Sequence, residues 1–400
     1  MRILVVAHSL PRPTWGAGTR NYHLLRALAR EHTVSLLALV HPDERDHNAA
    51  AHLHPHTRAI HQVEVPYSGS KRLNQVVALA RGKSYTLTSQ ILPAAQAALD
   101  AELARNAYDA VLFEGLLVAG YRVSPQVRTI LDEHNIEHEL MQRSYQSGDG
   151  LMRRGFNWME YRRMKPVEIA RCRRADLVLV TSERERAVLR ALLPEKDVRV
   201  VPNGVDVEAF SADPSIEETN GRIIFTASFD YYPNVQGALY FAEHIWPLVR
   251  RAIPGATWHL VGRNPPPEVT RLGTLPGVTV TGSVPAVQPH LAAAQVAIVP
   301  LLTGAGTRLK ILEALSMRRA VVSTALGCEG IECVPGKHLL VADKPEAFAG
   351  AVVDLLGDQV RRVRLGEDGR ALVKERYSWD SCGAQLLAAL KSARENGWHV

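Results

Sequence analysis

Residues 297–330 read AIVPLLTGAGTRLKILEALSMRRAVVSTALGCEG, which predicts an apolar strand, a glycine-rich turn and a helix that begins near Arg308 and Lys310. Gly304 and Gly306 lack a Cβ and can adopt positive φ, so the turn can bring backbone N–H groups close to a ligand. The first helical turn adds N–H groups without intrahelical partners and the positive end of the helix dipole. Together these features predict an anion site that suits a phosphate.

Glu313 lies about two helical turns beyond Gly306, at roughly 1.5 Å rise per residue. Its carboxylate can accept hydrogen bonds from paired hydroxyls such as those of a ribose. Phosphate and ribose together predict a nucleotide. In the alternative interpretation the charged side chains form only the solvated face of an amphipathic helix, whose core face is Leu309, Leu312 and Leu315.

The length of 400 residues predicts about two domains with sizeable cores. The four cysteines are too few and too scattered for a disulfide framework, and no signal peptide precedes the first strand, so a cytoplasmic protein is expected. Cys328 and Cys333 lie close together, but no further pair follows at zinc spacing, so they predict no metal site. No apolar run reaches the roughly 18 residues of a membrane span.

The net charge is +6, and residues 151–175 alone carry eight Arg or Lys against Glu160 and Glu168. Because Trp158 and Tyr161 lie within the same stretch, one hypothesis is peripheral contact with anionic lipid on the inner face of a membrane. The alternative is a solvated basic helix with a core-facing aromatic stripe. No nucleic-acid-binding motif accompanies the charge, so nucleic acid is not an expected partner.

Short apolar strands alternate with helical patterns in both halves of the chain, which predicts parallel sheets. The expected strands of the first half are residues 2–7, 33–39, 59–65, 110–113, 129–132, 177–181 and 198–201. Those of the second half are residues 222–227, 257–261, 278–281, 296–300 and 320–323. The polar stretch 211–220 separates the two sets and marks a domain boundary.

Residues 175–210 read ADLVLVTSERERAVLRALLPEKDVRVVPNGVDVEAF, and the PNGVD at its end predicts a turn that tolerates positive φ where the chain leaves one domain. This stretch and residues 297–330 resemble the retaining GT-B glycosyltransferases of family 4, also called group 1. The resemblance implies two doubly wound Rossmann-like α/β domains facing across a cleft. It divides the chain into an acceptor-side domain (1–210), a donor-binding domain (211–376) and a last helix that crosses back to the first domain (377–400).

The resemblance also implies the reaction. A sugar passes, with retention of configuration, from a nucleoside-diphosphate sugar to a glycan, lipid-linked or other hydroxyl acceptor, in polysaccharide or glycoconjugate biosynthesis. No cofactor is expected besides the donor, and because the sequence has no D-x-D motif, no metal is expected on the diphosphate. The implied donor-binding residues are Gly16, Gly18, Arg263, Gly304, Gly306, Thr307, Arg308, Lys310 and Glu313, of which Lys310 and Glu313 are also expected to act in catalysis.

The segment TILDEHNIEHEL places His134 just after a strand, where the carboxyl ends of a parallel sheet line a ligand crevice. It resembles the strand-end "HN" of the family, which implies that His134 is catalytic and reaches the transferring sugar, with Asp132 orienting its ring. A buried, satisfied histidine is the alternative. Glu114 ends another strand and is expected to contact the acceptor.

The first strand leads into HSLPRPTWGAGTRNYHLLRALA, in which Gly16 and Gly18 suggest a dinucleotide fingerprint. Asn21 stands at the third glycine position, so an oxidoreductase is not favoured. The segment resembles instead the first-domain loop of the family, which implies that the glycines approach the donor and that Arg20 contacts the acceptor. Alternatively, these residues only begin the helix expected at 22–30.

Two departures from the family affect the expected donor site. Many relatives carry an arginine and a lysine in the first loop of the donor domain, where this chain has Phe229, Asp230, Tyr231 and Tyr232. Ala305 stands at the first glutamate of the E-x7-E signature, so recognition of the donor sugar must differ. Two other functions therefore stay open: a catalytically silent sugar- or nucleotide-binding scaffold, and a nucleotide-sugar epimerase of the same fold.

Overall fold

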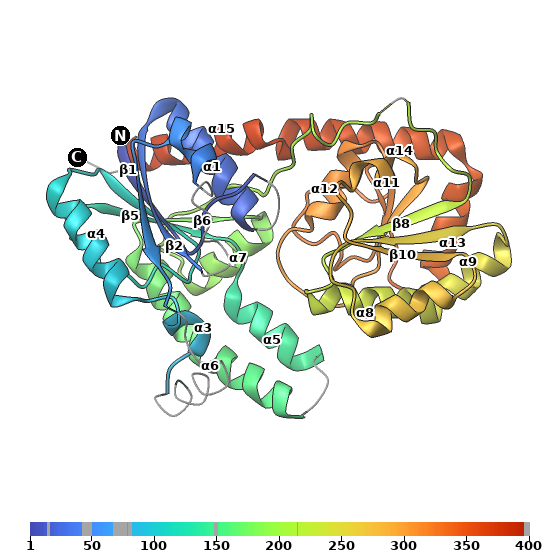
Figure 1. Ribbon diagram of the computed structural model, residues 1–400, viewed down its shortest axis with the longest axis horizontal. Helices are drawn as coiled ribbons and strands as arrows, with labels where there is room; N and C mark the ends of the chain where they lie inside the picture. Colours follow the sequence, from blue (N-terminus) through green and yellow to red (C-terminus); the bar gives the residue numbers. More distant parts are fainter. Residues whose placement is uncertain are drawn as a thin grey trace. The chain divides into compact units, whose positions relative to one another are not determined.

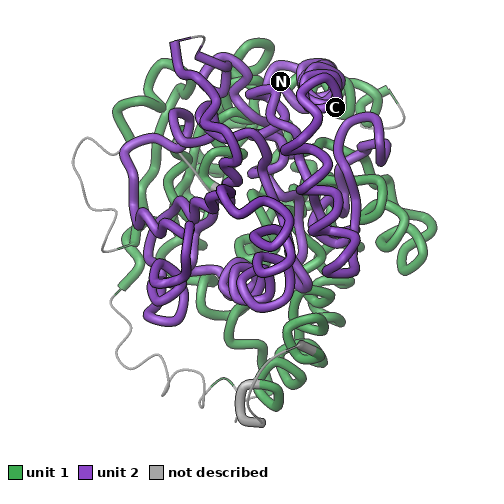
Figure 2. The backbone as a smooth tube through the Cα atoms, turned by 90° about the vertical axis from the view of Figure 1, so that its right-hand side faces the viewer, with its two compact units in different colours: residues 1–202, 382–400 green, residues 203–381 purple. Residues whose placement is uncertain are grey.

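The computed structural model describes residues 1–13, 17–41, 50–66, 78, 82–147, 151–213 and 215–395. The chain forms two compact units, which Figure 2 colours separately: unit 1 contains residues 1–202 and 382–400, and unit 2 contains residues 203–381. The chain thus leaves unit 1 at Pro202, inside the PNGVD turn, and returns within α15 (Trp379–Glu395). The sequence pattern placed these two boundaries after residues 210 and 376.

Among the described residues, unit 1 contains a seven-stranded sheet in the order β3-β2-β1-β4-β5-β6-β7, and every pairing is parallel (Figure 1). The strands are β1 (Arg2–Ala7), β2 (Thr33–Val40), β3 (Ala59–Glu64), β4 (Ala110–Glu114), β5 (Arg128–Glu133), β6 (Leu177–Val180) and β7 (Val198–Val200). The order reverses between β1 and β4. The predicted parallel sheet is confirmed, and strands β1, β2, β4 and β6 are buried on both faces, as a doubly wound sheet requires.

Helices cover both faces of this sheet. They are α1 (Ala17–Glu31), η2 (Ala51–His56), α3 (Tyr85–Thr88), α4 (Pro93–Arg105), α5 (Glu137–Ser147), α6 (Leu151–Arg174) and α7 (Glu183–Leu192). One core cluster joins the sheet to α1 and α15, and a second joins it to α4, α6 and α7. A Cβ on Gly383 would lie 2.6 Å from the Cβ of Ala27, so only glycine allows α15 to lie this close to α1.

Both acidic residues of α6 point into unit 1. Glu160 accepts hydrogen bonds from Ser84 Oγ at 2.8 Å and from Tyr85 N at 3.0 Å at the start of α3. Glu168 accepts from the backbone N of Glu137 and of His138 at the start of α5, at 2.8 and 2.9 Å. Both carboxylates are fully buried, so they serve as helix caps and do not offset the basic residues on the outside of α6.

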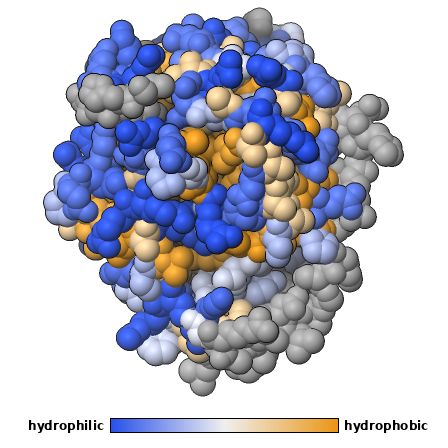
Figure 3. All heavy atoms as spheres, turned by 90° about the vertical axis from the view of Figure 1, so that its left-hand side faces the viewer, coloured by the Kyte–Doolittle hydropathy of each residue, from blue (hydrophilic) through white to orange (hydrophobic). Residues whose placement is uncertain are grey.

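On the face that looks left in Figure 1, hydrophilic residues predominate and apolar residues gather near the centre (Figure 3). Within the described part of the chain, no helix is both long enough and apolar enough to cross a bilayer.

Unit 2 contains a second parallel sheet, with six strands among the described residues in the order β10-β9-β8-β11-β12-β13. The strands are β8 (Arg222–Thr226), β9 (Thr257–Val261), β10 (Val278–Gly282), β11 (Val296–Val299), β12 (Ala320–Ser323) and β13 (Leu340–Val341). The main helices are α8 (Tyr232–Tyr240), α9 (Trp246–Ala252), α11 (Gln288–Ala292), α12 (Leu309–Ser316), α13 (Pro345–Gly357) and α14 (Gln359–Leu372). Figure 1 shows α8, α9 and α13 on one side of the sheet and α11, α12 and α14 on the other. The strand order reverses between β8 and β11.

At Gly262 the loop that follows β9 passes very close to the end of β8. Its N donates to Gly282 O at 3.2 Å, and a Cβ on this residue would lie 1.6 Å from Ala227 O. Any side chain would therefore push these two strand ends apart. Arg263 is the next residue, so the close approach of Gly262 also fixes the backbone position from which the Arg263 side chain extends.

We expect Gly262→Ala to lower the free energy of unfolding by about 2 kcal/mol or more, because the new methyl group has no room. Urea unfolding measures this loss. Gly255→Ala is the matched control, since nothing lies within 4 Å of a Cβ there. Equal stability of the two variants would contradict the close approach.

Candidate active site

The sequence-predicted residues gather at the carboxyl edges of the two sheets, where parallel α/β sheets bind ligands next to the point of strand-order reversal. In unit 1, Glu114 ends β4 and His134 follows β5. In unit 2, the turn of Gly304 and Gly306 follows β11 and leads into α12. Each unit therefore holds one group of candidate residues.

Arg20 lies in the interior of unit 1. Its Nε donates to Asp132 Oδ2 at 2.8 Å and its Nη2 to Asp132 Oδ1 at 2.7 Å, while Nη1 donates to Pro202 O at 3.0 Å. Arg20 is 3% exposed and Asp132 is fully buried. Removing one partner of such a buried pair costs about 3 to 5 kcal/mol. The side chain predicted to contact the acceptor thus also holds α1 against β5; the acceptor role itself stays a prediction.

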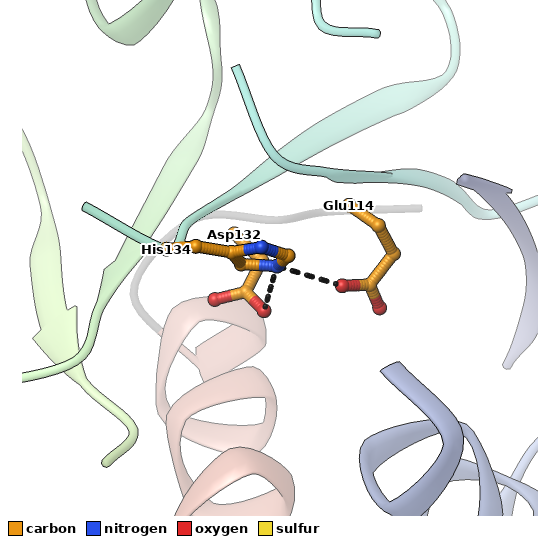
Figure 4. A group of neighbouring side chains, drawn as sticks. All are labelled: Glu114, Asp132 and His134. Atoms are coloured by element: carbon orange, nitrogen blue, oxygen red, sulfur yellow. Dashed lines mark hydrogen bonds and ion pairs between the residues drawn. The ribbon is translucent and has the colours of Figure 1, made fainter. Parts of the chain in front are cut away.

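His134 lies between two carboxylates, as Figure 4 shows. Its Nε2 is 3.3 Å from Glu114 Oε2 and 3.4 Å from Asp132 Oδ2, and 13% of its side chain is exposed. Gly115 follows β4 with φ +94°, and a Cβ there would be 3.7 Å from His134 Nδ1. The glycine therefore keeps space open beside the ring nitrogen that does not contact the carboxylates.

The buried charges of this group determine one another's pKa values. Burial opposes the charged form of His134, but hydrogen bonds and negative charge from Asp132 and Glu114 outweigh it and raise the pKa of His134 to about 9. Burial also disfavours the Asp132 carboxylate, yet the charge of Arg20 holds its pKa well below the usual range. Burial raises the pKa of Glu114, and the charge of Asp132 adds to the effect. His134 is therefore an imidazolium, which can donate a hydrogen bond but cannot accept a proton.

Glu114, Asp132 and His134 offer one ligand atom each within 4.8 Å of one another, a spacing that a metal ion could use. Arg20, however, already donates to both oxygens of Asp132. With two carboxylates, one guanidinium and one imidazolium, the buried charges balance. A divalent ion in place of the imidazolium proton would leave buried positive charge uncompensated, so these residues fit a proton better than a metal.

The glycine loop of unit 1 is only partly described. Gly16 lies outside the described residues. Gly18 lies in the first turn of α1, and its O accepts a hydrogen bond from Arg12 N at 3.1 Å. A Cβ on Gly18 would be 3.4 Å from Arg12 N, which is van der Waals contact. Its contact with the donor stays a prediction.

The glycine turn of unit 2 adopts the predicted backbone. Gly304 and Gly306 have φ of +110° and +79°. Ala305 N donates to Tyr231 Oη at 3.3 Å, and a Cβ on Gly304 would lie 2.8 Å from the same oxygen, so Tyr231 lies against the turn. Thr307 Oγ1 is buried and has no hydrogen-bond partner in the described structure, and such a group is suited to a ligand.

Arg308 is buried within the glycine turn. It is 6% exposed, and its Nη1 donates to the carbonyl oxygens of Ala305 and Gly306. The guanidinium therefore shapes the glycine turn from inside. Its contact with a phosphate stays a prediction.

A hydrogen-bonded network joins three loops at this edge of the sheet. Lys310 Nζ donates to Asn234 Oδ1 at 2.7 Å, and Asn234 Nδ2 donates to Ser228 O at 2.7 Å. Ser228 Oγ accepts from Arg263 Nε at 3.0 Å and donates to Asp230 Oδ2 at 3.0 Å. The loops after β8, β9 and β11 are thus connected, and the cations of Lys310 and Arg263 belong to one network.

Lys310 and Glu313 occupy one half-buried stretch of α12. Lys310 Nζ lies 4.3 Å from the ring centroid of Phe225. Burial, with the charge of Arg308, lowers the pKa of Lys310 to about 7; burial raises the pKa of Glu313 to about 7. The leucines of this helix do face the core as the alternative interpretation required, with Leu312 and Leu315 fully buried, but the two charged side chains are not a freely solvated face. Shifts of this kind are typical of functional sites.

Sequence reasoning did not find Ser228, Tyr231 or Asn234 as members of the site. All three belong to the segment that follows β8, and their position after a strand of a parallel sheet was the available signal. The segment lacks the two cations of many relatives, but its Asn234 accepts the hydrogen bond of Lys310 and its Tyr231 contacts the glycine turn.

Two family models match the chain. Residues 15–209 match the model described as Glycosyltransferase Family 4, and residues 220–358 match the model described as Glycosyl transferases group 1. Together the two matches cover most of the chain.

The chain is similar to a GDP-mannose-dependent alpha-(1-6)-phosphatidylinositol monomannoside mannosyltransferase of Mycolicibacterium smegmatis. The identity is 30% over 244 residues, which are 55% of this chain and 63% of that relative. The corresponding Mycobacterium tuberculosis protein is 29% identical over 54% of this chain and 62% of its own length. The chain thus aligns with less than two thirds of either relative.

Solved structures share the fold. Sucrose-phosphate synthase from Thermosynechococcus elongatus superposes with a TM-score of 0.72 at 20% identity, covering 99% of this chain and 100% of that one. HepE from Anabaena in complex with UDP superposes with a TM-score of 0.66 at 15% identity, covering 98% and 100%. Both superpositions confirm the predicted GT-B fold with two Rossmann-like domains.

The geometry around His134 predicts its titration. At pH 8 we expect the ring still to be protonated, because the two carboxylates raise its pKa to about 9. NMR of the ring nitrogens measures the midpoint, and His134→Gln identifies the signal. Glu114→Gln should shift the midpoint to lower pH, since one negative charge is lost. A midpoint near 6.5 in the unmodified protein would contradict the proposed charge balance.

Proposed function

Because the chain belongs to the group 1, or family 4, glycosyltransferases, we propose that it transfers a sugar from a nucleoside-diphosphate sugar to a hydroxyl of a glycan or lipid-linked acceptor in polysaccharide or glycoconjugate assembly. The observation that carries this proposal is the network from Lys310 through Asn234 to Ser228 and Arg263, which brings two cations to the point where the strand order of unit 2 reverses. Such an edge is where α/β sheets bind nucleotides.

The donor fits this edge through complementary charge. The amides of the Gly304 and Gly306 turn and the ammonium of Lys310 would receive the diphosphate. Arrival of the phosphates would favour the charged form of Lys310, whose pKa of about 7 leaves it only partly charged beforehand. Glu313 would accept hydrogen bonds from the ribose hydroxyls. The names of the relatives and the UDP of HepE make GDP-mannose and UDP-sugars the first donors to test.

We propose that the reaction uses no metal or further cofactor. Positive charge on Lys310 and the turn amides would stabilise the leaving nucleoside diphosphate, and a preorganised donor of this kind contributes about 3 kcal/mol. The imidazolium of His134 would donate to a hydroxyl of the transferring sugar. We further propose retention of configuration: the acceptor hydroxyl attacks the anomeric carbon on the face that the leaving phosphate vacates, the bond to the phosphate breaks, and the hydroxyl proton passes to the leaving phosphate oxygen.

A scaffold that binds nucleotide sugars without turnover is the second candidate function. It is favoured by Ala305, which lacks the carboxylate that relatives place near the donor sugar, and by Asp230, an exposed anion in the loop where relatives carry cations. Nucleotide binding without transfer or hydrolysis would support this alternative.

Lys310→Ala and Glu313→Ala should each lower the rate of sugar transfer more than tenfold while the protein stays folded, because each removes one contact with the nucleotide. Thermal unfolding against UDP, GDP, ADP, dTDP and their sugars identifies the donor first, since a ligand at 100 times its dissociation constant adds about 2.7 kcal/mol. Lys337→Ala, an exposed lysine elsewhere in unit 2, is the control. Normal turnover in either folded site variant would exclude the assignment, and no thermal shift with any ligand would count against the function.

We also propose that α6 contacts an anionic membrane, where a lipid-linked acceptor would be found. Arg154, Trp158, Arg162 and Lys165 follow one another at spacings of four, four and three residues, which places them on one face of the helix. Trp158 is 44% exposed, and the guanidinium of Arg162 lies 5.4 Å from its ring centroid. Since the acids of α6 are buried caps, this face is basic with an aromatic side chain, as interfacial helices are.

Charge reversal on this face should weaken vesicle binding. We expect the protein to sediment with phosphatidylcholine vesicles only when they contain phosphatidylglycerol, and to be released by salt. The triple change Arg154→Glu, Arg162→Glu and Lys165→Glu should weaken binding by about a hundredfold, at about 1 kcal/mol per basic residue. The control reverses the exposed basic residues of unit 2, Lys337, Arg364 and Lys374. Equal binding by both triple variants would exclude α6 as the contact.

A further inference from the structure

His8 follows β1 at the point where the strand order of unit 1 reverses. β1 pairs with β4 so that Ala7 lies opposite Glu114, and His8 therefore continues beside the end of β4. The Nδ1 of His8 lies 3.4 Å from Glu114 O, and the O of His8 accepts a hydrogen bond from His41 Nε2 at 3.2 Å. Both the ring and the backbone of His8 are thus held in place at the edge of the candidate site.

The contact with Glu114 O determines which ring nitrogen of His8 carries the proton. A carbonyl oxygen can only accept, so Nδ1 donates and Nε2 retains its lone pair. Burial, with the charge of His134, lowers the pKa of His8 to about 4, so the ring is neutral near pH 7. His8 Nε2 is therefore a hydrogen-bond acceptor, and no residue in the described structure donates to it.

His134 has the opposite character on the other side of Glu114. Its Nε2 contacts the carboxylates of Glu114 and Asp132, which leaves Nδ1 as the outward donor. One histidine thus contacts the backbone oxygen of Glu114 and the other contacts its carboxylate. The two histidines therefore differ in protonation state because their surroundings differ, so that one can accept a hydrogen bond and the other can donate one.

We propose that His8 is a substrate-binding residue that accepts a hydrogen bond from a sugar hydroxyl at Nε2 while His134 donates one from Nδ1. A hydroxyl group both donates and accepts, so sugar hydroxyls complement an acceptor and a donor of this kind. The inference rests on the proposed sugar transfer. The hydroxyl belongs either to the donor sugar or to the acceptor, and the two sources differ in what a change at His8 affects.

The test compares His8→Phe, which removes the acceptor atom, with His8→Gln, whose amide oxygen can stand near the place of Nε2. His54→Phe, at an exposed histidine of η2, is the matched control. Calorimetry measures the affinity for GDP, UDP and their sugars. Release of nucleotide from the bound sugar donor, with water or with p-nitrophenyl α-mannoside as acceptor, measures turnover and the acceptor KM. Loss of one hydrogen bond predicts a change of about fivefold to tenfold.

Two results would support the inference. If the hydroxyl belongs to the donor sugar, His8→Phe weakens binding of the nucleotide sugar but not of the nucleotide alone. If it belongs to the acceptor, donor affinity stays unchanged while the acceptor KM rises or turnover falls. In either case His8→Gln should recover most of the loss and His54→Phe should behave like the unmodified protein.

Two other results would overturn it, for different reasons. Binding and turnover in His8→Phe equal to those of the unmodified protein would exclude a role for His8 while leaving the transfer function intact. An unmodified protein that binds no nucleotide or nucleotide sugar would instead refute the proposed function, and the inference with it.

Discussion

Arg20 donates through two nitrogens to both oxygens of Asp132 inside unit 1, and a third nitrogen reaches Pro202 O at the last residue of the unit's first segment. With the positive charge of Arg20 beside it, Asp132 stays ionised although it is fully buried, and an ionised Asp132 in turn keeps His134 protonated. Only a guanidinium can satisfy both carboxylate oxygens and the carbonyl at once with fixed geometry. The position of α1 on the sheet, the charge of His134 and the chain path at Pro202 therefore depend on one side chain.

Unit 2 positions basic side chains at the carboxyl edge of its sheet, although the loop that follows β8 carries none. Neutral groups do this: Asn234 orients the ammonium of Lys310, and Ser228 Oγ accepts from Arg263. Tyr231 lies against the glycine turn through its hydroxyl, and Arg308 supports the turn from inside. The first loop thus contributes to this edge by positioning basic side chains that come from other segments.

The two groups of residues have complementary chemistry. Unit 2 offers Lys310 and backbone amides, which suit phosphate, and a carboxylate at Glu313, which suits a ribose. In unit 1, the described residues near Glu114 form no comparable cationic turn; His8 and His134 lie on either side of Glu114 and are suited to neutral hydroxyl groups. Family membership, together with this division between an anion site and a hydroxyl site, is why sugar transfer explains the residues better than nucleotide binding alone.

The sequence by itself determined the parallel sheets, because buried strands between helices have a local apolar pattern; the expected strands at residues 2–7, 257–261 and 320–323 coincide with those in the structure. It also located the glycine turn and Lys310, since the end of an apolar strand and the glycines that follow it can be recognised from the order of the residues. Only the tertiary structure decided the pair of Arg20 and Asp132, whose members are 112 residues apart, and the inward course of Arg308. The sequence shows that a charged side chain is present but not where it points. Its orientation depends on which distant partner the fold brings within hydrogen-bonding distance.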